Sequence, residues 1–184
     1  MTTQKYIVLV RALSTKIKMK DLKDHLERVI GFKSLKTFFT TGNIILDAQE
    51  SMSKEEICNE ISNVLSNQYQ MEKPLMAIFN VDEYKDILSF NPYDKINESK
   101  TVIFFPINDV LKQSDYDKDK DFMTKATQWQ LVNGVIWYLG PTTGTASDVK
   151  IFKLIEKKIK PGSNNEYTFR TLRSSQKILD VANK

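Results

Sequence analysis

The sequence has very little of the chemistry on which disulfide, metal and membrane proteins depend. It contains one cysteine, Cys58, so no intramolecular disulfide bond can form. It contains one histidine, His25, whereas a structural zinc site needs roughly four Cys or His ligands. The only apolar run near the start, Tyr6 to Val10, is stopped by Arg11 and is too short for a signal peptide or a membrane span. We therefore expect a cytoplasmic protein with no metal, no cofactor and no membrane partner.

Catalytic and phosphate-binding motifs are also missing. The sequence has no GxGxxG, GxSxG or HExxH motif, and a Ser-His-Asp triad would have to use His25, next to an apolar helical stripe. Aspartates alternate from Asp115 to Asp121, but a calcium loop would need glycine at Lys120 and glutamate at Ala126. The loop Gly140–Thr145 lacks the P-loop lysine; it is either a plain loop that caps a helix or a weak anion cradle. These absences argue against an enzyme of a known type.

What the sequence does contain is one order of strands and helices that occurs twice. In the first half, apolar patterns and turn residues predict strands at 6–10, 35–39, 44–46 and 75–79. A helix over 19–30 ends at Gly31, a second begins at the capping box of Ser53 and Glu56, and a short third helix follows Asn80. Cys58 lies in the apolar stripe of the second helix, which predicts a buried thiol and not a nucleophile.

The second half repeats this order. Strands are predicted at 101–105, 128–132, 135–139 and 167–169, with Asn133-Gly134 as a tight hairpin turn. One helix follows a capping box of Thr145 and Asp148, and a last helix follows Thr171. Each half therefore reads βαββαβ with a trailing helix, which predicts an α+β protein made of two tandem ferredoxin-like domains with antiparallel sheets. The domains are expected at 1–92 and 99–184.

The charge of the last segment allows a nucleic-acid interface. Residues 149–184 carry 9 basic and 3 acidic side chains, which indicates either an anionic partner or a solvated lysine face. Aromatic residues on the two central strands of a ferredoxin-like sheet often stack on RNA bases, but they also serve as core packing. The residues of this alternative are Phe104, Trp137, Tyr138, Lys150, Lys153 and Lys157.

Four short motifs resemble those of a bacterial family, domain of unknown function 1697. They are Val10-Arg11, Thr41-Gly42-Asn43, Asn91-Pro92-Tyr93 and Thr168-Phe169-Arg170. The family pattern has Leu-Arg-Gly-Ile-Asn-Val-Gly-Gly at the first motif; this chain keeps the arginine and a methionine, Met19, but has Ala12 where the first glycine is expected. The resemblance implies two ferredoxin-like domains in a cytoplasmic protein with no assigned activity. A family site that uses the glycine loop is not expected here, because Ala12 and Lys16 lack the backbone freedom of glycine.

These observations favour a non-catalytic binding protein for a small anion or a protein partner. Polar groups at strand ends and turns are where binding sites tend to lie. The candidate ligand-binding residues are Arg11, Ser14, Lys18, Thr41, Asn43, Thr168 and Arg170. The alternatives are that Gly42 and Asn43 only shape a turn and that Arg11 pairs with a carboxylate. Weak single-stranded nucleic-acid binding and an enzyme of unrecognised type, for which no general base is evident, remain as further alternatives.

Overall fold

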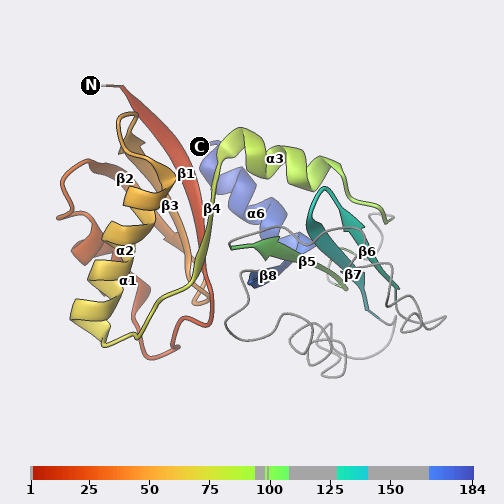
Figure 1. Cartoon of the computed structure of the whole chain (residues 1–184), viewed down its shortest axis with the longest axis horizontal. Coiled ribbons are helices and arrows are strands. Elements are labelled where there is room, and N and C mark those ends of the chain that lie inside the picture. Colours follow the sequence, from red (N-terminus) through yellow and green to blue (C-terminus); the bar gives the residue numbers. More distant parts are fainter. Residues whose placement is uncertain (1, 94–97, 99, 108–127, 141–165) are drawn as a thin grey trace. The chain divides into compact units, whose positions relative to one another are not determined.

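The computed structural model describes residues 2–93, 98, 100–107, 128–140 and 166–184 (Figure 1). The described residues form two four-stranded antiparallel sheets and four helices, a mixed α and β architecture, as the sequence predicts. Within this part of the chain, none of the helices has the length and apolar character needed to cross a membrane. By compactness the chain divides into two units, Met1–Lys85 together with Ile178–Lys184, and Asp86–Lys177.

The first sheet is built from the first half of the chain. Its strands pair in the order β2-β3-β1-β4, so that β1 and β3 are central. The elements in chain order are β1 (Thr3–Val10), α1 (Met19–Leu26), β2 (Phe32–Phe38), β3 (Asn43–Gln49), α2 (Lys54–Tyr69), β4 (Met76–Asn80) and α3 (Val81–Ser89).

One face of this sheet and two helices form the first core. Side chains alternate along a strand, so Tyr6, Val8 and Val10 of β1 point to the same side. They pack with Ile44 and Leu46 of β3. The apolar residues of α1 and α2 complete this cluster, and Figure 1 shows both helices against the same face of the sheet. The helix residues are Leu22, Leu26, Ile57, Ile61 and Leu65.

Hydrogen bonds fix where α2 and α3 begin. The predicted capping box is present: Ser53 Oγ accepts from the Glu56 N–H at 3.2 Å, and the Glu56 carboxylate accepts from the Ser53 N–H at 2.7 Å. Asn80 caps α3 as expected, because its Oδ1 accepts from the Glu83 N–H at 2.8 Å.

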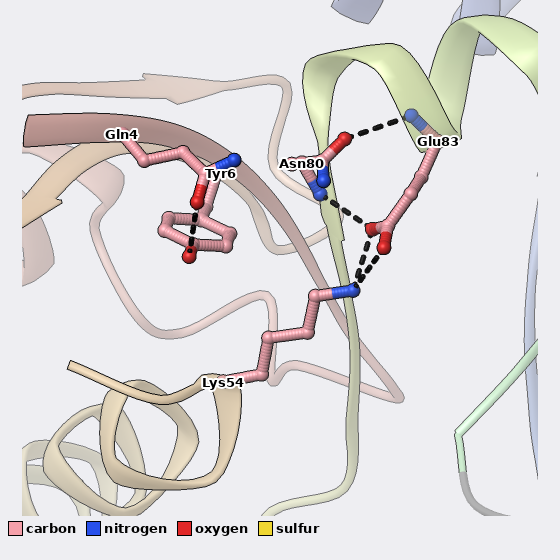
Figure 2. Close-up of polar contacts among 5 residues, drawn as sticks. All are labelled: Gln4, Tyr6, Lys54, Asn80 and Glu83. Atoms are coloured by element: carbon pink, nitrogen blue, oxygen red, sulfur yellow. Dashed lines mark hydrogen bonds and ion pairs between the residues drawn. The ribbon is translucent and has the colours of Figure 1, made fainter. Parts of the chain in front are cut away.

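The Glu83 carboxylate also joins the two helix starts. It accepts from the Asn80 N–H at 2.9 Å and pairs with the Lys54 ammonium at 2.5 Å (Figure 2). Beside this pair, the Tyr6 hydroxyl donates to Gln4 Oε1 at 2.8 Å. Burial raises the pKa of Tyr6, and the negative charges of Glu83 and Glu50 raise it further. Helix capping and packing therefore account for the polar contacts of the residues drawn in Figure 2.

The second sheet has the order β6-β7-β5-β8, with β5 and β7 central. Its strands are β5 (Thr101–Pro106), β6 (Gln128–Val132), β7 (Val135–Leu139) and β8 (Tyr167–Thr171), and α6 (Leu172–Ala182) follows β8. The predicted Asn133-Gly134 turn is confirmed: Val132 pairs with Val135, and φ is 50° at Asn133 and 79° at Gly134.

The last helix begins where the sequence places it. Thr171 Oγ1 accepts from the Ser174 N–H at 3.2 Å, so Thr171 caps α6. The predicted calcium-like aspartates, the loop Gly140–Thr145 and the capping box of Thr145 and Asp148 lie outside the described residues.

One element differs clearly from its prediction. The helix expected over 19–30 ends at Leu26, and the chain turns through a Phe32 N–H to Val29 C=O hydrogen bond of 3.2 Å. Ile30, expected on the apolar stripe, is therefore 92% exposed. The apolar spacing in the sequence continues beyond Leu26, where α1 ends. Apolar spacing alone does not show where a helix stops.

Candidate functional site

The loop that follows β1 carries most of the accessible candidate residues. The loop runs from Arg11 to Lys18. The Arg11 N–H donates to the Leu75 carbonyl at 2.8 Å, which connects the start of the loop to the residue before β4. Buried side chains of Leu13 and Ile17 anchor the loop to the first core. The Ser14 carbonyl accepts from the Ile17 N–H at 3.0 Å, so the loop closes on itself before α1 begins.

The loop backbone adopts a conformation that glycine normally favours. Ala12 has a φ of 52°. This is the position at which the family pattern has its first glycine. The expectation that Ala12 would lack the necessary backbone freedom is therefore wrong for φ, since the alanine takes the left-handed conformation despite its Cβ.

The β2–β3 hairpin packs directly on this loop. The Gly42 carbonyl accepts from the Val10 N–H at 2.8 Å. A Cβ on Gly42 would lie 3.0 Å from Cβ of both Val10 and Leu13, and φ at Gly42 is 77°. On the other side of the hairpin, Thr37 Oγ1 donates to the Met19 carbonyl at 3.3 Å. The hairpin thus contacts both the start of the loop and the start of α1.

Asn43 holds the hairpin together from inside. Its side chain is fully buried, and Nδ2 donates to the Phe38 carbonyl at 2.8 Å and to Thr41 Oγ1 at 3.0 Å. The Asn43 amide therefore shapes the turn, which was the stated alternative, and ligand contact by Asn43 stays a prediction.

The loop has charge of one sign. Residues 11–20 include Arg11, Lys16, Lys18 and Lys20 and no acidic side chain. Arg11 is a partly buried residue and Lys18 an exposed one. Among the described residues, neither the Arg11 guanidinium nor the Lys18 ammonium has a hydrogen-bond or ion-pair partner. The alternative that Arg11 pairs with a carboxylate therefore finds no partner in the described part of the chain. The arrangement can attract and hold an anion.

Two further candidates lie in the other unit. Thr168 and Arg170 are on β8, and both are buried. Arg170 Nη1 donates to Thr168 Oγ1 at 3.2 Å and to the Phe169 carbonyl at 2.7 Å. These bonds hold the guanidinium along its own strand. The burial of Thr168 and Arg170 favours a structural role over direct contact with a ligand. By contrast, Arg11, Ser14 and Lys18 follow the end of β1, and Thr41 precedes the start of β3, which is at the same end of the first sheet.

The nucleic-acid alternative loses its stacking surface. Base stacking needs an exposed aromatic face, but Phe104 is 3% exposed and Trp137 and Tyr138 are fully buried. These rings act as packing, the other interpretation considered from the sequence. The lysines of this alternative, Lys150, Lys153 and Lys157, lie outside the described residues.

Sequence reasoning missed an aromatic pair at the tip of the hairpin. The rings of Phe38 and Phe39 lie 4.0 Å apart between centroids, and Phe39 is 42% exposed. Phe39 has a φ of 54°, which bulky residues rarely adopt. Two adjacent phenylalanines directly before a Thr-Thr-Gly turn were the available signal, but they read as the end of a strand.

The single histidine and the single cysteine both have environments that suit a structural role. His25 Nδ1 lies 3.0 Å from the Tyr69 hydroxyl, a side-chain contact between α1 and α2. Burial raises the pKa of the Cys58 thiol to about 11, which suits the predicted inert thiol. In the described part of the chain, no group of three or more His, Cys, Asp or Glu is placed to hold a metal ion.

The fold and the site define a mixed α and β protein with two four-stranded sheets and a basic loop at the end of the first. The chain belongs to the family described as "Protein of unknown function (DUF1697)", whose model matches residues 3–137. This confirms the resemblance seen in the motifs, and the description assigns no activity. No curated protein sequence matches the chain.

A solved structure shares the fold over the whole length. It is the conserved bacterial protein SP0830 from Streptococcus pneumoniae, with a TM-score of 0.73, 14% sequence identity and coverage of 100% of both chains. At this identity the likeness is one of fold alone.

Proposed function

We propose that this protein is a non-catalytic binding protein that holds a small anion at the end of its first sheet. The site is the surface of the loop Arg11–Lys18 and the neighbouring hairpin residue Thr41. The observation that carries the proposal is the Arg11 guanidinium, which has no partner among the described residues and belongs to a loop that has no acidic side chain.

A guanidinium in this position has reason to bind an anion. It presents planar N–H donors that match carboxylate and phosphate oxygens, and charge-assisted hydrogen bonds of this type are stronger than neutral ones. The hydroxyl of Ser14 and the ammonium of Lys18 are exposed on the same loop and supply further donors. Because the loop is anchored by Leu13 and Ile17, little ordering of the chain is needed on binding.

The test is anion binding to the full-length protein by isothermal titration calorimetry, with inorganic phosphate and citrate as probes. Arg11→Ala is expected to weaken binding by about tenfold or more, because a hydrogen bond to a charged group contributes roughly 1.5–3 kcal/mol. Arg11→Lys keeps the charge but not the planar donors, so its affinity should lie between the affinities of the wild-type protein and of Arg11→Ala. Arg28→Ala removes an exposed arginine from the turn after α1 and is the matched control.

Equal affinity of wild-type protein and Arg11→Ala for every probe would refute the proposal. An acidic protein partner is the second candidate for the same surface, since its carboxylates offer Arg11 the same chemistry. That case predicts no phosphate or citrate binding, and binding of an acidic partner that Arg11→Ala weakens.

We further propose that each sheet is the core of a ferredoxin-like domain. The order β1-α1-β2-β3-α2-β4 and the pairing order β2-β3-β1-β4 support this for the first. The second sheet has the equivalent order, β6-β7-β5-β8. The proposed domains are 1–92 and 99–184, in a cytoplasmic protein, where the Cys58 thiol would stay reduced.

A further inference from the structure

An exposed aromatic ring stands at the tip of the β2–β3 hairpin, at the end of the first sheet from which the basic loop also leaves. Phe39 is 42% exposed and leans on Phe38, with 4.0 Å between ring centroids and 50° between ring planes. It also keeps a φ of 54°, in the left-handed region. Strained backbone of this kind persists only where the surroundings fix it, and it is concentrated at functional sites.

The surroundings do fix the hairpin that carries this ring. Gly42 is in contact with Val10 and Leu13, and the Val10 N–H donates to the Gly42 carbonyl. Phe38 pairs with Asn43 in the strand register, and the Asn43 amide donates to the Phe38 carbonyl. The ring pair therefore belongs to a turn that is hydrogen-bonded to the end of β1, where the basic loop begins.

We propose that the anion bound at this end of the first sheet carries a planar aromatic ring, as a nucleoside monophosphate does. The phosphate lies toward Arg11, and the base stacks on Phe39. The inference rests on the proposed function and adds the ligand class to it. An aromatic side chain can stack on any nucleobase, because every base has a π face. We therefore expect the site to be less selective for the base than for the phosphate.

The experiment compares ligands that share a phosphate and differ in the ring. Full-length protein is titrated with adenosine 5′-monophosphate, uridine 5′-monophosphate, ribose 5-phosphate and inorganic phosphate. We expect the two nucleotides to bind roughly tenfold or more tighter than ribose 5-phosphate, the size of effect that base stacking typically gives. Equal affinity for nucleotides and ribose 5-phosphate overturns the inference and leaves the anion site standing.

Variants assign the effect to the ring. Phe39→Ala should remove the nucleotide preference and leave ribose 5-phosphate binding unchanged, whereas Phe39→Leu keeps apolar bulk without a π face and should lose most of the preference. Phe90→Ala is the matched control, because Phe90 is a comparably exposed phenylalanine, at 50%, of the other unit. A nucleotide preference that survives Phe39→Ala overturns the assignment of the base to this ring.

Two further outcomes are informative. If no probe binds, the proposed anion site fails, and this inference fails with it. A 5′-phosphorylated pentaadenylate distinguishes a free nucleotide from the end of a nucleic acid. It should bind no tighter than adenosine 5′-monophosphate, and much tighter binding that depends on Phe39 overturns the assignment to a free ligand.

Discussion

Replacing Gly42 by alanine tests how the hairpin and the basic loop are held together. The change adds a single methyl group between β1 and the loop. That methyl would sit 3.0 Å from Cβ of Val10, 3.0 Å from Cβ of Leu13 and 3.2 Å from the Val10 carbonyl oxygen. All three are atoms of backbone or of Cβ, so no flexible side-chain end can swing away.

The expected loss of stability has two sources. An L-residue in the left-handed conformation costs roughly 1–2 kcal/mol, and φ at Gly42 is 77°. Overpacking a well-filled site costs typically 1–3 kcal/mol because the backbone must shift. Together they predict that Gly42→Ala lowers the free energy of unfolding by about 2–5 kcal/mol.

A second glycine separates these two sources. Gly31 also has a positive φ, 99°, but an added Cβ would meet Sδ of Met52 at 2.9 Å, the movable part of a flexible side chain. Gly31→Ala should therefore cost mainly the conformational part, about 1–2 kcal/mol.

The assay is urea unfolding of full-length protein followed by circular dichroism and by hydrogen exchange of residues 43–49. Tryptophan fluorescence is a separate probe, because both tryptophans, Trp129 and Trp137, lie in the second unit. If Gly42→Ala destabilised the first sheet no more than Gly31→Ala, the close approach at Gly42 would not be a constraint.

Three other changes have defined expectations. Ala12→Gly should raise the free energy of unfolding by about 0.5–1 kcal/mol in urea titrations, because φ at Ala12 is 52°; a loss would show that the strain is not there. Ser53→Ala should cost about 1 kcal/mol, and Ser51→Ala, at an exposed turn, should cost nothing measurable. The Ser53 N–H and hydroxyl hold the pKa of Glu56 below its usual 4.5, so these bonds stabilise the fold above that pH and are lost as the pH falls through the lowered pKa; an NMR titration in which Glu56 has the pKa of an ordinary glutamate would contradict it. Because burial raises the pKa of Cys58 to about 11, alkylation by iodoacetamide at pH 8 should be about a hundredfold slower than that of an ordinary thiol, and it should rise toward pH 11; ordinary reactivity in folded protein would contradict the burial.

The elements that sequence predicted well are those whose signals are local. Asn133-Gly134 specifies its turn by backbone preference alone, and Ser53 with Glu56 specifies the start of α2 by hydrogen bonds three residues apart. Such signals do not depend on what packs against them.

The features that the sequence did not predict are set by backbone conformation and by burial in the folded chain. Ile30 continues the apolar pattern of α1, but the helix ends at Leu26 and Ile30 is exposed. Burying Ile30 would need an apolar surface against it, which the pattern does not specify. Phe39 read as the end of a strand, and only its φ and its exposure distinguish it from a packed residue. Arg170 read as an accessible residue before a helix, whereas the sheet buries it beside Thr168.

The motif residues near the first sheet differ in how much the fold explains them. Gly42 is required by its φ and by the lack of space for a Cβ, and Asn43 is required by its two side-chain hydrogen bonds within the hairpin. Their presence therefore follows from folding and needs no ligand. Arg11 is different: its backbone N–H serves the fold, but its guanidinium forms no bond with any described residue, and a lysine or a neutral side chain would leave the same backbone contact intact. Arg11 is therefore the motif residue near the first sheet whose side chain the described fold does not explain, and it is the one to test for ligand binding.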